Sequence, residues 1–257
     1  MSETRVAGGA GGGRYRLAMS SRGVRTTTSP RVVQRVDELV ACSRGRSVLH
    51  LGCTNWPYTA ESERAGTLLH RSLEGAAAAL TGLDADPEGL AALRERGFER
   101  LLVGDLERLG EVSWFGDDDL GPIGPFDLII AGEVLEHLGS PAALLDGVRP
   151  LLAPDGELVI TVPNAYCAFR FASYALSRRR GNPEPVHPDH VAYYSETTLA
   201  HLVDEAGYDV VDLAFYDLGR EHRPSAPRSW RVVNDLAMRV APQLADGVLA
   251  RCRPRTP

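Results

Sequence analysis

Short apolar runs alternate with helix-length segments along most of the chain. Three of these runs, Ser47–Leu51, Leu80–Leu83 and Leu101–Val103, are each followed by glycine or aspartate. Residues 66–79 and 87–96, which separate them, have the length and the apolar spacing of helices. Strands that alternate with helices predict βαβ units, and therefore a parallel sheet.

The same alternation continues toward the C-terminus. Further helices are expected over 30–45, 141–152, 196–206 and about 229–241, and further strands over 126–131, 157–162, 209–215 and 247–252. Together these elements predict an α/β fold with a doubly wound, mostly parallel seven-stranded sheet and helices on both faces.

The domain organisation follows from where this alternation begins and breaks. Residues 1–28 mix glycine, serine, threonine and arginine without periodicity, which predicts a flexible N-terminal tail. Residues 29–257 are expected to form one domain. Aromatic residues, then arginines and prolines, interrupt it at about 164–195, which predicts an aromatic helix and a loop inserted on the substrate side.

Composition narrows the possible functions. All 28 basic residues are arginine, so chemistry that needs a lysine, such as a P-loop or an internal Schiff base, is excluded. The net charge of −6 disfavours nucleic-acid binding. The four cysteines lie far apart, without a C-x-x-C pair. No apolar run is long enough for a membrane span or a signal peptide, so a cytoplasmic protein is expected.

The residues that follow the predicted strands form an ordered series. In an open parallel sheet, ligands bind beyond the carboxyl ends of the strands, so these residues are candidates for a binding site. The four segments are Leu49-His50-Leu51-Gly52-Cys53, Thr81-Gly-Leu-Asp84, Val103-Gly-Asp105-Leu106 and Phe126-Asp-Leu-Ile-Ile-Ala-Gly132-Glu133-Val-Leu-Glu136-His137-Leu.

In their order and spacing, these segments resemble class I S-adenosylmethionine-dependent methyltransferases. The resemblance implies that S-adenosylmethionine is the cofactor, with Asp84 accepting hydrogen bonds from the ribose hydroxyls and Asp105 accepting one from the adenine amino group. Gly132 and Glu133 would border its methionine end. The cofactor-binding residues expected from the resemblance are His50, Gly52, Cys53, Asp84, Asp105, Leu106, Gly132 and Glu133.

A cluster of acids and histidines follows the fourth strand. Glu133, Glu136 and His137 have the E-x-x-E-H spacing of ubiquinone-pathway O-methyltransferases and small-RNA 2′-O-methyltransferases, where a downstream histidine completes a metal site; His190 is the candidate here. These four residues are the expected ligands of a divalent ion such as Mg²⁺. Alternatively, His137 or His190 is the catalytic base, and no metal is needed.

The resemblance predicts methyl transfer to a small-molecule acceptor, with a hydroxyl of a sugar or secondary metabolite favoured. One departure weakens it: His50 replaces the family's strand-end acid, and Thr54 and Trp56 replace loop glycines. The alternative is therefore a noncatalytic binding module whose pocket is filled by side chains such as Trp56. An NAD-dependent dehydrogenase ranks last, because its glycine fingerprint is absent.

Some other residues remain ambiguous from sequence alone. His70 is expected on a helix surface or behind the site, and His187 in a loop. The aromatic residues 166, 169 and 174 are expected to be core packing or, less readily, a substrate platform. The arginines at 178–180 are most simply a solvated face, with a phosphate-bearing substrate as the alternative.

Overall fold

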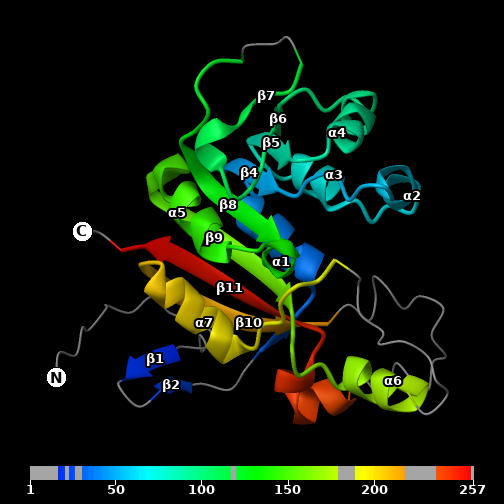
Figure 1. Ribbon diagram of the computed structural model, residues 1–257, viewed down its shortest axis with the longest axis vertical. Helices are drawn as coiled ribbons and strands as arrows, with labels where there is room; N and C mark the ends of the chain where they lie inside the picture. Colours follow the sequence, from blue (N-terminus) through cyan, green and yellow to red (C-terminus); the bar gives the residue numbers. More distant parts are fainter. Residues whose placement is uncertain are drawn as a thin grey trace.

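A computed structural model of the protein describes residues 17–20, 23–26, 31–116, 120–178, 189–217 and 236–255. In these residues the main sheet has nine strands in the order β3-β10-β11-β9-β8-β4-β5-β6-β7 (Figure 1). They are β3 (Val32–Val33), β10 (Tyr208–Tyr216), β11 (Gly247–Pro254), β9 (Leu152–Pro163), β8 (Phe126–Gly132), β4 (Ser47–Leu51), β5 (Ala79–Asp84), β6 (Leu101–Val103) and β7 (Ser113–Trp114).

The α/β class is confirmed, but the prediction of seven mostly parallel strands is wrong in detail. The seven predicted strands are all present, and the two-residue strands β3 and β7 extend the sheet at its two edges. β11 runs antiparallel to both of its neighbours, and β7 is antiparallel to β6. The central block β9-β8-β4-β5-β6 is parallel, as predicted.

Helices cover both faces of this sheet (Figure 1). They are α1 (Arg35–Ser43), α2 (Thr59–Arg64), α3 (Leu69–Glu74), α4 (Pro87–Arg94), α5 (Pro141–Val148), α6 (Ala168–Arg178) and α7 (Glu196–Glu205), with 3-10 turns η1 (Leu109–Glu111), η2 (Leu135–His137), η3 (Arg149–Leu151) and η4 (Pro242–Leu244).

Alternate residues of each central strand belong to separate cores, because successive strand side chains point to opposite faces. Ile129 and Ala131 of β8 pack in the larger core with the apolar side chains of α5 and α7. Leu128 and Ile130 pack in a second core with Leu39 of α1 and Leu73 of α3. The sheet is therefore buried on both faces, as its nearly continuous apolar strands require.

Two helix predictions need correction. The helix expected over 30–45 is shorter, because Val32 and Val33 pair with β10 as β3 and α1 begins at Arg35. The helix expected over 66–79 is only the six-residue α3, and α2 lies before it, where no helix was expected. Gly66, with φ of 69°, separates these two short helices.

Regular structure occurs in the predicted N-terminal tail and, as expected, in the predicted insertion. Residues 17–20 and 23–26, inside the segment expected to lack regular structure, form an antiparallel pair, β1 (Leu17–Ser20) with β2 (Gly23–Thr26). The predicted aromatic helix of the insertion is α6. Within the described residues, no helix has the length and apolar character needed to cross a bilayer.

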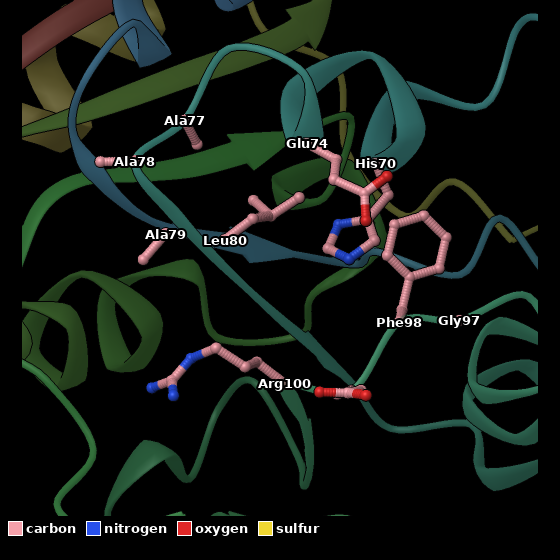
Figure 2. Close-up of a pocket in the computed structure, with 10 residues that line it drawn as sticks. His70, Glu74, Ala77, Ala78, Ala79, Leu80, Gly97, Phe98 and Arg100 are labelled. Carbon is pink, nitrogen blue, oxygen red and sulfur yellow. The ribbon is translucent and has the colours of Figure 1, made fainter.

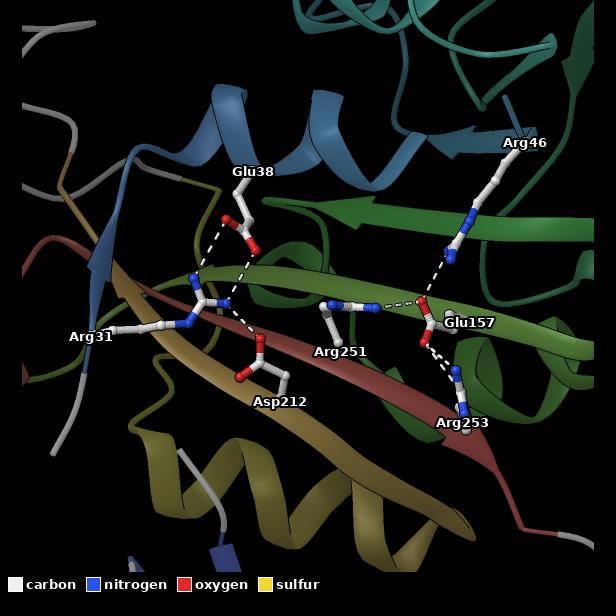
Figure 3. Close-up of polar contacts among 7 residues, drawn as sticks. All are labelled: Arg31, Glu38, Arg46, Glu157, Asp212, Arg251 and Arg253. Carbon is white, nitrogen blue, oxygen red and sulfur yellow. Dashed lines mark hydrogen bonds and ion pairs between the residues drawn. The ribbon is translucent and has the colours of Figure 1, made fainter. Parts of the chain in front are cut away.

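A buried carboxylate in the middle of β9 contacts three arginines (Figure 3). Glu157 is 1% exposed; its Oε2 accepts hydrogen bonds from Arg46 and Arg251, and its Oε1 accepts them from Arg253. Burial alone would raise the pKa of Glu157, but the hydrogen bonds from Arg251 and Arg46 lower it to about 2. The ion pairs therefore stabilise the fold wherever the carboxylate is ionised.

We expect Glu157→Gln to lower the free energy of unfolding at pH 7 by on the order of 2 to 3 kcal/mol. A depressed pKa contributes stability that is present above the unfolded value near 4.5 and is lost as the pH falls toward 2. Urea titrations at pH 7, 4.5 and 3 measure this loss, with the exposed Asp155→Asn as control. If the free energy of unfolding of Glu157→Gln falls toward low pH as steeply as that of the wild type, the stabilising role of the Glu157 carboxylate is contradicted.

Candidate functional site

The strand ends singled out in the sequence meet at one edge of the sheet. Because β8, β4, β5 and β6 are parallel neighbours, the residues after them share the carboxyl edge. Gly52 turns the chain away from β4 with φ of 67°, and its amide donates to Leu83 O at 2.8 Å. A Cβ at Gly52 would lie 2.9 Å from the Val134 side chain, so glycine is required there.

Asp84, at the end of β5, organises the loop that follows β4. Its Oδ2 accepts hydrogen bonds from Thr54 N at 3.0 Å and Thr54 Oγ1 at 2.8 Å, and its Oδ1 accepts one from Asp86 N at 3.1 Å. Thr54 therefore ties the loop after β4 to Asp84, the expected ribose acceptor. The N-cap of α4 is Asp86, whose Oδ1 accepts hydrogen bonds from Glu88 N and Gly89 N.

The next strand end supplies Asp105, which is exposed to solvent. Its Oδ1 accepts a hydrogen bond from Glu107 N at 2.9 Å, and its Oδ2 lies 3.3 Å from Arg108 Nε. Leu106 packs against the larger core. The carboxylate of Asp105 thus lies one strand away from that of Asp84, at the same edge.

His50 makes a buried pair with His70 of α3. The two Nδ1 atoms are 3.1 Å apart and the rings stack at 5.3 Å, while His70 also contacts the Phe98 ring at 4.6 Å. Burial lowers the pKa of both imidazoles, that of His70 to about 3, so both are neutral at pH 7. One imidazole donates and the other accepts. The His50 side chain is therefore turned toward α3, and Cys53 is likewise buried, against Leu68 and its neighbours.

A cavity of about 250 Å³ lies near His70, but away from the carboxyl edge (Figure 2). Residues 77–80 line it at the amino end of β5, together with Phe98 and Arg100, whereas Asp84 ends the same strand. The cavity is therefore separate from the strand ends that carry the predicted cofactor residues.

Gly132 and Glu133 lie beside an arginine that the sequence analysis did not single out. Arg35, at the start of α1, donates from Nε to Thr161 Oγ1 at 3.1 Å and lies 3.9 Å from Glu133 Oε1. A Cβ at Gly132 would come within 2.9 Å of the Arg35 guanidinium. The sequence shows only that Arg35 lies in the predicted first helix. Its position over β8 and β9 depends on how that helix packs on the sheet, which the sequence pattern does not reveal.

Glu133 has an unusual backbone and a buried partner. Its φ is 57°, in the left-handed region, and its Oε1 accepts a hydrogen bond from the Tyr216 hydroxyl. Burial, and then the charge of Glu133, raise the pKa of Tyr216 well above its usual value, so this hydroxyl stays protonated. The Glu133 side chain is thus directed toward β10.

Three of the four predicted metal ligands converge on one point. Side-chain ligand atoms of Glu136, His137 and His190 all lie within 4.8 Å of one another, and the two imidazole rings are 4.7 Å apart. Glu133 is outside this group, because Glu136 and His137 lie in the 3-10 turn η2 while the left-handed Glu133 precedes it. The loop that carries His190 is attached to η2 by Val191 N, which donates to Glu136 O at 2.8 Å.

Glu136 is the most unusual residue of this cluster. It is fully buried, and neither carboxylate oxygen has a hydrogen-bond partner among the described residues. Burial, followed by the nearby charge of Glu133, raises its pKa to about 8. A buried acid without a partner costs free energy unless it binds a proton or a cation. The donor set of one carboxylate and two imidazoles fits a divalent ion.

The remaining candidates are exposed side chains or lie outside the described residues. Trp56 is 41% exposed, and Tyr166 and Phe169 are 68% and 50% exposed, so the core interpretation of these last two aromatics does not apply. His187 lies outside the described residues, as do the arginines at 179 and 180.

Comparisons with known proteins show the family to which this chain belongs. A family model described as a methyltransferase domain matches residues 25–213. A ubiquinone biosynthesis O-methyltransferase of Aromatoleum aromaticum is 26% identical over 185 residues, which are 70% of this chain and 69% of that protein. One from Xylella fastidiosa is 30% identical over 129 residues, which are 50% of this chain and 46% of that protein.

Solved structures with the same fold are more distant in sequence. An Archaeoglobus fulgidus SAM-dependent methyltransferase matches 85% of this chain and 90% of its own, with a TM-score of 0.52 and 16% identity. The magnesium protoporphyrin IX methyltransferase of Synechocystis, solved with bound SAH, matches 86% and 82%, with a TM-score of 0.50 and 14% identity. The family model, together with the ordered strand ends, places this chain in the class I S-adenosylmethionine-dependent methyltransferases.

Proposed function

We propose that this protein transfers a methyl group from S-adenosylmethionine to a hydroxyl oxygen of a small molecule, a sugar or secondary metabolite being the favoured acceptor. The observation that carries the proposal is the cluster of Glu136, His137 and His190, which follows directly after the Gly132 to Glu133 segment. The relatives named as O-methyltransferases support oxygen as the acceptor atom.

The cofactor is expected along the carboxyl edge. In this arrangement, Asp84 accepts hydrogen bonds from the ribose hydroxyls and Asp105 accepts one from the adenine amino group. The methionine end lies by Gly132 and Glu133, and its carboxylate pairs with Arg35, whose side chain is 12% exposed and already lies over this segment. An arginine that is so little exposed, beside one glutamate, is well suited to hold an anionic group.

Catalysis in this arrangement rests on positioning and on one proton transfer. The acceptor oxygen attacks the sulfonium methyl in line, the carbon–sulfur bond breaks, and S-adenosylhomocysteine leaves without a covalent enzyme intermediate. An imidazole of His137 or His190 accepts the hydroxyl proton. Once it has released its proton, the Glu136 carboxylate lies close enough to both rings to stabilise an imidazolium that forms there.

A divalent ion is the second way in which this cluster would work. Glu136, His137 and His190 would hold it, and when bound it would lower the pKa of the acceptor hydroxyl. Glu133 is not required, because its carboxylate is engaged by Tyr216.

The test is S-adenosylhomocysteine formation from S-adenosylmethionine with a panel of catechols, nucleotide sugars, amines and thiols. We expect turnover with hydroxyl acceptors only. Turnover confined to amines or thiols contradicts the proposal. Repeating the active reaction in EDTA, with Mg²⁺ added back, separates the mechanisms: reversible inhibition indicates a metal, and unchanged activity indicates a histidine base.

A further inference from the structure

We propose that Tyr216 is a positioning residue for methyl transfer, acting through Glu133 on the methionine end of the cofactor. The inference rests on the proposed function, since it needs the methionine end to lie by Gly132 and Glu133. The site is otherwise built from the ends of β4, β5, β6 and β8. Tyr216 lies on β10, which β11 and β9 separate from β8 in the sheet.

A hydrogen bond ties Tyr216 to Glu133. Tyr216 is 0% exposed, and its hydroxyl donates to Glu133 Oε1. A buried hydroxyl without a hydrogen-bond partner destabilises the fold. The Tyr216 hydroxyl therefore constrains where the Glu133 carboxylate sits, and the carboxylate in turn satisfies the hydroxyl.

Glu133 needs such a restraint because of its backbone. A non-glycine residue at φ of 57° is unfavourable unless its surroundings hold it there. Two contacts do so on the described chain: Glu133 N donates to Thr161 O at 2.9 Å, and the Tyr216 hydroxyl holds the side chain. Arg35, 3.9 Å away, lies close to the same carboxylate oxygen.

The sheet places Tyr216 and Arg35 close to one carboxylate. Tyr216 pairs with Val33 of β3, and α1 begins two residues later at Arg35. On its other side Tyr216 pairs with Gly247 of β11, where a Cβ would overlap the tyrosine ring. Gly247 thus leaves space for the Tyr216 ring. The pairing of β3 with β10 brings Arg35 to the Glu133 carboxylate that Tyr216 also contacts.

Glu133 and Arg35 have a role in cofactor binding in this proposal, in addition to their packing. Glu133 and Arg35 form a pair of opposite charges at the expected position of the cofactor's amino and carboxylate groups. Fixing the Glu133 carboxylate fixes where an ammonium group can bind and leaves the guanidinium available to a carboxylate. Tyr216 therefore pre-organises a site for a zwitterionic amino acid group.

The test compares Tyr216→Phe with Tyr208→Phe. Tyr208 is a matched control, since it lies on the same strand, is equally buried, and donates its hydroxyl to Leu145 O at 2.6 Å, a backbone atom of α5. We expect Tyr216→Phe to raise the dissociation constant of S-adenosylhomocysteine and the KM for S-adenosylmethionine about tenfold, with kcat changed less than threefold. We expect Tyr208→Phe to lower Tm and leave both constants unchanged.

A double-variant cycle provides a second measurement that does not depend on Tyr216→Phe alone. Glu133→Gly removes the carboxylate and suits the left-handed backbone. In that background, Tyr216→Phe is expected to have no further effect on the dissociation constant. Wild-type affinity in Tyr216→Phe, equal losses in both tyrosine variants, or full additivity with Glu133→Gly would each overturn the proposal. If the wild-type protein does not bind S-adenosylhomocysteine, the proposed function fails instead.

Discussion

Asp84→Ala is expected to weaken S-adenosylhomocysteine binding at least 100-fold. The carboxylate is the only acidic group at the end of β5 that is not an N-cap, and it also holds Thr54 through two hydrogen bonds. Removing it deletes both expected ribose contacts, each a hydrogen bond to a charged group, and frees the loop after β4. Titration calorimetry measures the change.

Asp86→Ala is the matched control for this substitution. Asp86 lies two residues away and caps α4 through Glu88 N and Gly89 N, so its loss should cost about 1 kcal/mol of stability. We expect the affinity for S-adenosylhomocysteine to change less than threefold in this variant. Equal affinity in Asp84→Ala and wild type would show that the ribose assignment is wrong.

Glu136→Gln is expected to lower kcat by about 10² to 10⁴ while the affinity for S-adenosylhomocysteine stays within threefold of wild type. The substitution keeps the volume of the side chain but removes the acid group, and the proton that it can exchange, beside both His137 and His190. Because the buried carboxylate has no hydrogen-bond partner among the described residues, the fold does not depend on it for hydrogen bonding. Steady-state kinetics at saturating cofactor measure the loss.

Two observations complete the Glu136 experiment. His201→Ala, which changes an exposed histidine paired with Glu205 on α7, controls for unspecific effects and should leave kcat unchanged. Full activity in a folded Glu136→Gln variant would remove this acid from the mechanism.

The sequence predicted the central strands closely and the edges of the sheet poorly. β4 and β6 have the predicted bounds, because a buried strand is a continuous apolar run and the following Gly52 or Gly104 ends it visibly. β3 and β7 contain two residues each, which is too short for a periodic signal. β3 exists through pairing with the distant strand β10, and β7 through pairing with β6 after the connection 104–112.

Some residues of the candidate site could be predicted from the sequence, and others could not. The sequence could identify three candidate residues at the ends of predicted strands: Asp84, Asp105 and Gly132. Because a parallel sheet brings the carboxyl ends of its strands to one edge, these residues were expected to lie at that edge. Glu133 was grouped with Glu136 by spacing, but its left-handed backbone turns it toward Tyr216. Arg35 and Tyr216 were not identifiable, because their places depend on how β3 and β10 pair.

His50 illustrates a replacement that the sequence could not interpret. The change from an acid to a histidine indicated a weakened cofactor loop, with a noncatalytic binding module as the alternative. The structure gives that imidazole a buried partner in His70 and gives Thr54 two hydrogen bonds to Asp84. The loop is therefore held by contacts of its own, and Trp56, which is partly exposed, is not a buried plug.

The binding of S-adenosylhomocysteine to the wild-type chain tests the central claim most directly. Calorimetry with ligand up to high micromolar concentration is expected to show saturable binding to one site per chain, lost in Asp84→Ala and retained in Asp86→Ala. The absence of any detectable binding by the folded wild-type protein would contradict the account and favour a noncatalytic member of the family.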